Sequence, residues 1–455
     1  MIGTLTLSSL ISPLAGELLG SDVEFSVLAT DTRTLKPGDV YLALVGENFD
    51  GNDFVEQALA RGASAAIVSE FADIALPQLK VSDTHAALGK IAALIRRRSK
   101  ARLIALTGSQ GKTTVKELLG AILQSRAPTL VTAANLNNTI GVPLTLLQLT
   151  GQHEFAVIEM GANCKGEIAF SVDVAQPDLA LITNASPAHI EGFGSLEGIV
   201  QAKGEIIDGL SAQGVALLNA DDPNCESWLK RAGSRKKVLF SQTNKPGSAE
   251  YYGKEIGIDE SAHTTFVLVT PKGEVNVLMN LLGKHNVTNA IAAAAAAMEA
   301  GASLDNIAKG LGSVLPVNGR LKPLSGSNGS IVIDDTYNAS PSSFYAAIDV
   351  LMCHHSPRIL VAGDMRELGG EAEAAHRHVG EYAAKLGVDR VLTVGEYSKI
   401  TAAACGSRAT HFETKAELVA ECKRLANPDT TFLVKGSRGA RMDTVVADIS
   451  LSEEV

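Results

Sequence analysis

The apolar run Leu103–Leu106 leads directly into a loop bounded by Gly108 and Gly111, and a helix is expected to begin at Lys112. A short apolar run without alternation is typical of a strand that is buried on both faces. Glycines allow the loop to turn its backbone N–H groups inward, and the start of the next helix adds partial positive charge. This order of strand, loop and helix predicts an α/β fold with an anion-binding loop at one end of its sheet.

The loop has the residues expected for binding the phosphates of ATP. Lys112 is expected to pair with the β- and γ-phosphates, and the Thr113 hydroxyl with Mg²⁺. The spacing is shorter than the general G-x-x-x-x-G-K-[ST] form, because Leu106 stands five positions before Gly111. A glycine-rich helix start with an exposed lysine is the alternative, and the preceding strand argues against it. We predict that ATP is bound by Gly108, Ser109, Gln110, Gly111, Lys112, Thr113 and Thr114.

A second apolar run, Phe155–Ile158, ends at Glu159. A buried strand next to the phosphate loop would deliver this carboxylate to Mg²⁺, which prefers oxygen ligands. The alternative is an acid at a strand end that faces solvent. We predict a metal site formed by Thr113 and Glu159.

The chain has 455 residues, which is too long for one hydrophobic core, and three units are expected. Residues 1–83 form a small N-terminal α/β domain, with strands expected at Val40–Val45 and Ala65–Val68. Residues 84–316 form a central ATPase-like domain, a parallel sheet with helices on both faces. Its further strands are expected at Leu179–Thr183 and Val215–Asn219, and an antiparallel hairpin at Thr264–Val269 and Val275–Met279.

Residues 317–455 form the third unit, which is expected to be a Rossmann-like domain. Helical stretches separate its strand candidates, which are Ser330–Ile333, Arg358–Ala362, Arg390–Val394 and Thr431–Val434. Polar residues follow several of these runs, and ligands gather at the carboxyl ends of strands in such sheets.

Composition excludes several classes of protein. The net charge of −10 argues against a sequence-blind nucleic-acid binder, and the short basic run Arg96–Arg98 is interpreted as a solvated helix end. Five scattered cysteines without a C-x-x-C pair argue against a disulfide framework or a zinc site. Residues 1–16 lack a signal-peptide pattern, and no run reaches the ~20 apolar residues that span a bilayer. We expect a cytoplasmic protein without membrane insertion, and a monomer.

The sequence resembles the Mur ligase family over nearly the whole chain. The resemblance rests on the order and spacing of the segments Gly108–Thr114, Asn135–Asn138, Glu159–Ala162, Ala202–Glu205, Gly283–Asn286, Gly319–Arg320 and Asp335–Asn338. Further segments resemble the branch that joins D-Ala-D-Ala to UDP-N-acetylmuramoyl-tripeptide, namely Asn184–His189, Gly192–Ser195, Asp334–Pro341 and Gly363–Gly369. The D-Y-A-H-T-P-D and D-N-P-R stretches that mark the ligase adding the third peptide residue are absent from the sequence.

The resemblance implies ATP-dependent amide-bond formation in cytoplasmic peptidoglycan precursor synthesis. The substrate carboxylate would attack the γ-phosphate, giving an acyl phosphate and ADP, and the amine of D-Ala-D-Ala would then displace phosphate. The protein's task would be positioning and charge neutralisation. Whether the third peptide residue is diaminopimelate or lysine stays open.

The resemblance also implies a catalytic set of Lys112, Glu159, His189 and Lys203. Thr113 and Glu159 would hold the first of two Mg²⁺ ions, and His189 and Lys203 the second. Lys203 would be carbamylated by CO₂, which turns a cation into an anion. Without the resemblance, His189 reads as a hydrogen-bonded structural residue and Lys203 as an exposed helix lysine.

The resemblance implies further roles in binding the nucleotide. Asn286 and Asn289 would lie on the adenine side, and the alternative is that they merely form a helix start. Arg320 would reach the γ-phosphate, Asp335 would bind the ribose, and Asn338 would help to hold the nucleotide. The expected substrate contacts are Asp31, Thr32, Arg33 and Gly46 for the UDP end, with Asn137, Asn138, Ser186, Lys435 and Arg438. For Lys435 and Arg438, a solvated loop is the alternative.

Three positions depart from the usual family pattern: Asn52 stands where His is common, and Gln110 and Ser340 stand where Asn is common.

Because the expected groups come from separate domains, we expect the domains to close about hinges, with linkers near Asp83 and Leu315–Val317. The alternatives are another amide ligase of the superfamily, such as folylpolyglutamate synthase or the third-residue-adding ligase, a nucleotide-dependent switch, and a structural scaffold. A nucleotide-dependent switch would not need the second metal that His189 and Lys203 imply. A guanine-specific switch would also carry an N-K-x-D motif, which the sequence lacks. A structural scaffold would not explain the phosphate loop.

Overall fold

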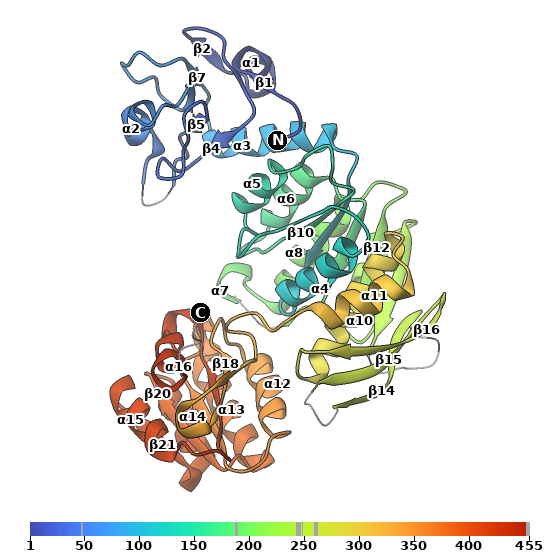
Figure 1. Ribbon diagram of the computed structural model, residues 1–455, viewed down its shortest axis with the longest axis vertical. Helices are drawn as coiled ribbons and strands as arrows, with labels where there is room; N and C mark the ends of the chain where they lie inside the picture. Colours follow the sequence, from blue (N-terminus) through green and yellow to red (C-terminus); the bar gives the residue numbers. More distant parts are fainter. Residues whose placement is uncertain (47–48, 187–189, 243–246, 248, 259–262, 452–455) are drawn as a thin grey trace.

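The computed structural model describes residues 1–46, 49–186, 190–242, 247, 249–258 and 263–451, and side chains at 190 and 191 are not described. Three α/β bodies follow one another in chain order along the long axis (Figure 1). Their sheets contain five, nine and six strands, and a two-stranded sheet joins β1 and β3. The expected three-domain α/β architecture is confirmed. The proposed boundaries at residues 83 and 316 fall in the connections between the sheets.

The first body has a five-stranded sheet in the order β2-β7-β6-β5-β4, parallel except for β2. Its elements are β1 (Leu5–Thr6), α1 (Leu7–Leu14), β2 (Glu17–Leu19), β3 (Glu24–Phe25), β4 (Leu28–Ala29), β5 (Val40–Leu42), η1 (Gly51–Phe54), α2 (Val55–Ala60), β6 (Ala65–Val68) and β7 (Gln78–Lys80). The next helix, α3 (Thr84–Arg98), begins where the Asp83 carboxylate accepts from the Ala86 N–H at 2.9 Å, as an N-cap should.

The second body has a nine-stranded sheet in the order β16-β15-β14-β13-β12-β11-β8-β10-β9. Its strands are β8 (Arg102–Thr107), β9 (Thr129–Val131), β10 (Phe155–Glu159), β11 (Leu179–Ile182), β12 (Val215–Asn219), β13 (Lys236–Ser241), β14 (Tyr251–Ile258), β15 (Thr264–Thr270) and β16 (Gly273–Met279). Its helices are α4 (Lys112–Gln124), α5 (Gly141–Leu146), α6 (Glu167–Ala175), α7 (Ile190–Phe193), α8 (Leu196–Asp208), α9 (Cys225–Ala232), α10 (Lys284–Glu299) and α11 (Leu304–Ser313).

Strand β8 explains why the central strands show no alternation of apolar and polar residues. Leu103 and Ala105 enter a core shared with α3, α5, α6 and α8, whereas Ile104 and Leu106 enter a core shared with α4, α10 and α11. Both faces of the sheet are therefore buried, as the sequence predicts. Strands β15 and β16 pair antiparallel, which confirms the expected hairpin, whereas β9, β13 and β14 were not anticipated.

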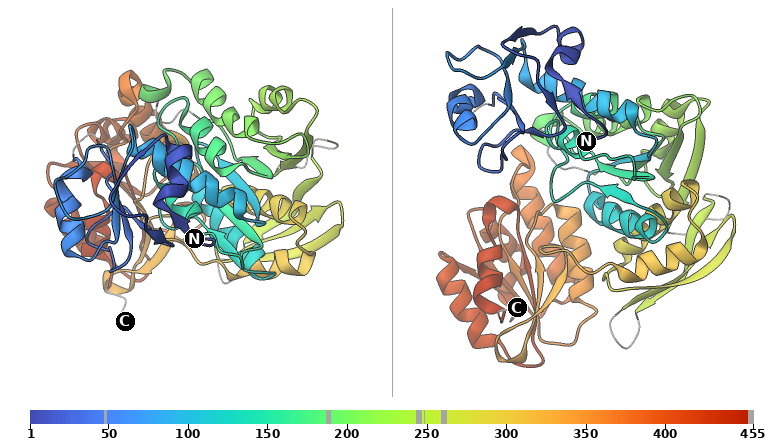
Figure 2. Two further views of the ribbon diagram at one scale, coloured as in Figure 1. Left: turned by 90° about the horizontal axis from the view of Figure 1, so that it is seen from above. Right: turned by 45° about the horizontal axis from the view of Figure 1, so that its top comes forward.

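The third body has a six-stranded sheet in the order β17-β18-β22-β19-β20-β21, parallel except for β17. Its strands are β17 (Lys322–Ser325), β18 (Ile331–Asp335), β19 (Arg358–Ala362), β20 (Arg390–Val394), β21 (Ala409–Phe412) and β22 (Thr431–Lys435). Its helices are α12 (Pro341–Leu351), α13 (Ala372–Leu386), α14 (Ser398–Cys405), α15 (Lys415–Leu425) and α16 (Asp443–Ile449), with short turns η2 (Ser327–Gly329), η3 (Gly369–Glu371), η4 (Gly406–Arg408) and η5 (Arg438–Ala440). Figure 2 shows this body facing the second one. Helix α3 lies between the first and second bodies, where it contacts α1 on one side and α5 and α6 on the other.

Within the part of the chain described, no helix is both long enough and apolar enough to cross a bilayer.

The run Arg96–Arg98 ends α3 as expected, and Arg97 and Arg98 are exposed, but the expectation is wrong for Arg96. Arg96 is not solvated: it is 9% exposed, and its guanidinium donates to the carbonyls of Ala175 at 2.9 Å and Gln176 at 3.2 Å. It also pairs with the Asp178 carboxylate at 3.1 Å. The connection between α6 and β11 covers this end of the helix. A run of three arginines cannot predict this contact, because it depends on how segments remote in sequence pack together.

Replacing Arg96 with alanine is expected to lower the free energy of unfolding by about 2–4 kcal/mol, because the carbonyls of Ala175 and Gln176 lose a charged donor and the Asp178 carboxylate loses its cation. The matched control is Arg97→Ala at the exposed neighbouring position, where a change within about 0.5 kcal/mol is expected. Denaturant unfolding of both variants measures the difference. Equal effects at the two positions would contradict the structural role of Arg96.

Candidate active site

A cleft of about 570 Å³ lies where the second and third bodies face each other. The carboxyl ends of β8, β10 and β11 open into it from one side, and residues around β18 and β22 close it from the other. The predicted site residues that line it are Gly108, Ser109, Gln110, Gly111, Lys112, Thr113, Thr114, Asn137, Asn138, Glu159, Lys203, Asn286, Asn289, Arg320, Asp335, Asn338 and Lys435. Residues as remote in the chain as Gly108 and Lys435 therefore share one cavity.

The phosphate loop requires both of its glycines for steric reasons. Gly108 has φ +155° and Gly111 has φ +79°, in the region that favours glycine. A Cβ on Gly108 would lie 1.9 Å from the Thr183 hydroxyl, and one on Gly111 would lie 2.4 Å from the Asn289 side-chain oxygen. Neighbouring elements thus press directly against the loop and fix its curvature.

Lys112 begins α4 and extends its ammonium over the loop. Its Nζ donates to the carbonyl of Gly108 at 2.7 Å and to that of Ser109 at 3.3 Å. Burial lowers the pKa of this ammonium, Arg320 lowers it further, and Glu159 acts in the opposite direction. A poorly hydrated cation at a helix start is suited to bind phosphate oxygens.

Glu159 ends β10 and is 1% exposed. Its Oε1 accepts from the Asn137 amide at 2.7 Å and from the Thr113 hydroxyl at 3.3 Å. Its Oε2 is buried and has no hydrogen-bond partner. A buried, unpartnered carboxylate oxygen is costly unless a further group engages it. The residues present fit a Mg²⁺ ion, which would be held by this oxygen and the Thr113 hydroxyl.

Lys203 lies on α8 and is buried at 3% exposure, so the interpretation as an exposed helix lysine is wrong. Burial lowers its pKa to about 7, and the nearby Lys112 acts in the same direction, whereas Glu167 and Glu205 oppose the shift. Its ammonium lies 5.4 Å from the centroid of the Phe193 ring. A large fraction of this amine is therefore neutral near pH 7, which is the form that can react with an electrophile.

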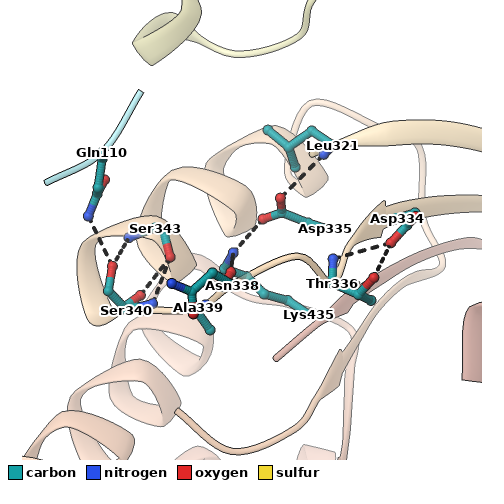
Figure 3. A network of polar contacts seen from close by, with 10 residues as sticks. All are labelled: Gln110, Leu321, Asp334, Asp335, Thr336, Asn338, Ala339, Ser340, Ser343 and Lys435. Atoms are coloured by element: carbon teal, nitrogen blue, oxygen red, sulfur yellow. Dashed lines mark hydrogen bonds and ion pairs between the residues drawn. The ribbon is translucent and has the colours of Figure 1, made fainter. Parts of the chain in front are cut away.

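The third body presents a compact polar network to the cleft (Figure 3). Lys435 is 1% exposed, which excludes a solvated loop at this position, and its Nζ donates to Asp335 Oδ2 at 2.6 Å and to the Asn338 carbonyl at 3.0 Å. Asp335 Oδ1 accepts from the Leu321 N–H at 3.3 Å. Arg320 reaches across the cleft, where its Nη2 lies 3.0 Å from the Thr113 hydroxyl.

The start of α10 forms the remaining wall. Asn286 donates to the Leu282 carbonyl at 2.8 Å, and Asn289 donates to the Asn286 side-chain oxygen at 2.9 Å. Both asparagines are 7% exposed and line the cleft. They are more than a generic helix start, because Asn289 also contacts the phosphate loop at Gly111.

Several predicted residues do not line this cleft. In the first body, Asp31 pairs with Arg33 at 2.7 Å, which lowers the pKa of Asp31 to about 2, and the buried Thr32 donates to Gln57. Gly46 is exposed in the same body, and Arg438 is exposed with its guanidinium 5.7 Å from the Tyr337 ring centroid. The Ser186 N–H donates to the Ser109 hydroxyl at 3.0 Å behind the loop. His189 lies outside the described residues.

The cleft also contains polar residues to which the sequence assigned no role. They include Asn163, Glu167, Asn219, His285, Arg366 and Glu367. Asn219 ends an expected strand and His285 precedes Asn286, so strand-end and motif signals existed for these two. No sequence signal was available for Asn163, in the loop before α6, or for Glu167, the first residue of α6, because their place in the cleft depends on the packing of α6 on α8.

Family models match three consecutive parts of the chain. Residues 24–96 match the "Mur ligase family, catalytic domain", residues 106–297 the "Mur ligase middle domain", and residues 319–438 the "Mur ligase, glutamate ligase domain". The matches follow the division into three bodies.

Individual relatives match over nearly the full length. The UDP-N-acetylmuramoyl-tripeptide–D-alanyl-D-alanine ligase of Escherichia coli (strain K12) is 48% identical over 97% of this chain and 98% of its own length. The ligase of the same name from Bacillus subtilis (strain 168) is 35% identical over 98% of each chain. The crystal structure of MurF from Acinetobacter baumannii superposes with a TM-score of 0.93 at 37% identity, covering 98% of this chain and 99% of that one. MurF from Thermotoga maritima, solved in complex with ADP, superposes with a TM-score of 0.84 at 27% identity over 93% and 96%. The chain belongs to the Mur ligase family.

Proposed function

We propose that this ligase joins D-Ala-D-Ala to UDP-N-acetylmuramoyl-tripeptide with hydrolysis of ATP to ADP and phosphate. The observation that carries the proposal is the cleft in which the phosphate loop faces Arg320, Asp335 and Lys435 of the third body. The likeness to ligases named for this reaction supports the choice of substrates.

The proposed reaction has two steps. A carboxylate oxygen of the tripeptide attacks the γ-phosphorus, the bond to the β-γ bridging oxygen breaks, and ADP leaves. The amine of D-Ala-D-Ala then attacks the acyl carbon, loses a proton, and phosphate leaves as the amide forms. Phosphorylation is needed because a carboxylate alone would have to expel oxide.

The residues of the chain position and neutralise the reacting groups. The loop N–H groups and Lys112 hold the phosphates, and Arg320 neutralises charge on the γ-phosphate from the opposite wall. Asp335 accepts hydrogen bonds from the ribose, with Asn338 beside it, and Asn286 and Asn289 face the adenine side. The first body, with Asp31–Arg33 and Gly46, binds the UDP end, and Lys435 with Arg438 the second substrate.

We further propose two Mg²⁺ sites. Thr113 and Glu159 hold the first, which the unpartnered Glu159 oxygen supports. Lys203, carbamylated, and His189 hold the second. Bound Mg²⁺ would lower the charge on the γ-phosphate and on the departing ADP. The ligase of this proposal is a cytoplasmic monomer with domains at residues 1–83, 84–316 and 317–455.

Release of phosphate from ATP is the direct test. We expect release only when UDP-N-acetylmuramoyl-tripeptide and D-Ala-D-Ala are both present, with one pentapeptide product formed per phosphate. Folate with glutamate in place of the two substrates is the control for the related ligases, and no release is expected. Equal release without D-Ala-D-Ala would contradict the proposal.

A further inference from the structure

The side chain of Gln110 links the phosphate loop to the third body. Its Nε2 lies 2.9 Å from the Ser340 hydroxyl, at the N-cap of α12 (Figure 3). It also lies within hydrogen-bond distance of the hydroxyl of Ser342, in the first turn of the same helix. A third hydroxyl, that of Ser186, lies at 3.4 Å. An amide group has only two hydrogens to donate, so the two nearer serines are its principal partners.

The backbone of Gln110 is fixed independently of its side chain. Its N–H donates to the Asn184 side-chain oxygen at 3.0 Å, and its carbonyl accepts from the Thr183 hydroxyl at 2.6 Å and the Asn184 amide at 3.2 Å. The loop therefore has no need of the Gln110 side chain to keep its shape. The side chain is free to serve the contact between the two bodies.

The partner end of the contact is equally well fixed. Ser340 is the N-cap of α12, and its hydroxyl accepts from the Ser343 N–H while the Ser343 hydroxyl donates to the Ser340 carbonyl. The residues just before it include Asp335 and Asn338, both of which accept from Lys435. A displacement of Ser340 would therefore also displace Asp335 and Asn338, which line the side of the cleft that faces the nucleotide.

We propose that Gln110 is a positioning residue that sets the separation between the phosphate loop and the start of α12. Through Ser340 and Ser342 it holds Arg320, Asp335 and Lys435 opposite the reacting phosphates. The expected effect of Gln110 on kcat rests on the proposed ligase function. Its expected effect on the contact between the two bodies does not depend on that function. The role differs from phosphate binding, because the side-chain amide points toward the serines.

The first test compares Gln110→Ala with Gln213→Ala, a control at an exposed glutamine away from the cleft. Gln110→Ala is expected to lower kcat about tenfold, the effect of one or two neutral hydrogen bonds, and to leave the Kd for ADP within about twofold. In a chain that already carries Ser340→Ala and Ser342→Ala, Gln110→Ala should have no further effect. Additive effects, or a Kd for ADP that rises as much as kcat falls, would overturn the inference.

A rescue experiment tests whether the reach of the Gln110 side chain matters, or only the presence of an amide at that position. Gln110→Asn removes one methylene of reach, and Ser340→Asn restores reach from the other side while keeping a residue that caps helices well. We expect Gln110→Asn to lower kcat about tenfold and the double variant to recover to within about twofold of the parent. Failure of the double variant to recover while its thermal unfolding stays normal would count against a role in spacing.

Small-angle X-ray scattering supplies a readout that needs no substrate. Gln110→Ala is expected to increase the radius of gyration relative to Gln213→Ala, because a contact between the bodies is lost. If the parent chain lacks ligase activity but the scattering change occurs, the proposed function fails and this inference stands. If the parent is active and the two alanine variants match in scattering and in kcat, this inference fails.

Discussion

Replacing Lys112 with methionine is expected to lower kcat/KM for ATP by about 1,000-fold, with little loss of thermal stability. Methionine keeps most of the length and apolar volume of lysine, so the start of α4 stays packed. What disappears is the buried ammonium that donates to the Gly108 carbonyl over the phosphate loop. Removing one positioned cation or donor from such a site typically costs about 100-fold to 1,000-fold or more.

Thermal stability should fall little, because burial lowers the pKa of the Lys112 ammonium and so penalises its charged form, which offsets the loss of its hydrogen bonds to the Gly108 and Ser109 carbonyls. Steady-state kinetics and thermal unfolding of Lys112→Met measure the two effects. The matched control is Lys116→Met, one turn later in α4, where a lysine at 1% exposure pairs with Glu117 at 2.8 Å and does not line the cleft. That variant is expected to keep kcat/KM within about threefold. A Lys112→Met enzyme within tenfold of the parent would contradict phosphate binding by this loop.

The parts of the fold that could be predicted depend on local pattern. The strand before Gly108, the helix from Lys112 and the strand that ends at Glu159 are each set by a few consecutive residues, and each lies within a residue or two of its expected bounds. Buried strands of a parallel sheet carry a clear signal because both faces are apolar. Short or exposed strands such as β9 carry no such signal.

The contacts that complete the site depend on the order of strands, which no local pattern contains. Thr183 reaches Gly108 because β11 lies beside β8, and Asp335 meets Lys435 because they are register partners in β18 and β22. Strand-end reasoning placed Glu159 near Thr113, and the family resemblance placed Asp335 and Arg320 near the nucleotide, but neither predicted these two contacts. The pairing of Gln110 with Ser340 was not anticipated, although both were noted separately as departures from the family pattern.

Burial was the property most often misjudged from the sequence. Arg96, and Lys203 without the resemblance, were interpreted as solvated, and a solvated loop was the open alternative for Lys435, yet all three side chains are buried. Each is buried by elements that are remote in sequence. For Lys203 and Lys435 the burial is part of the cleft, whereas for Arg96 it serves the packing of α3.

The second large expected effect concerns Lys203. Replacing it with alanine should lower turnover about 1,000-fold, and added formate or acetate should restore part of it by supplying the missing carboxylate. The matched control is Lys230→Ala on the neighbouring helix α9, where the lysine is exposed and pairs with Glu226. Turnover of that variant is expected to match the parent within about twofold.

Carbamylation itself has a pH dependence whose sign follows from the pKa. The neutral amine attacks the carbon of CO₂, one C–O π bond becomes an oxyanion, and the nitrogen releases a proton to solvent. Burial lowers the pKa of Lys203 to about 7, so about nine-tenths of the amine is neutral at pH 8 and about one-tenth at pH 6. At a fixed pressure of CO₂ the carbamate should therefore form at pH 8 and disappear as the pH falls below 7. Nothing in this step requires ATP or substrate.

The measurement is ¹³C NMR of the protein equilibrated with ¹³CO₂, with Lys203→Ala as the blank. A carbamate signal is expected at pH 8 that is absent from the blank and present in Lys230→Ala. An ordinary surface lysine, with a pKa near 10.4, would be largely protonated at this pH and should contribute little. The signal should titrate together with turnover, because both depend on one buried amine. Full activity of Lys203→Ala, or no carbamate in the parent protein at pH 8, would remove the proposed anionic ligand and with it this account of the second metal site.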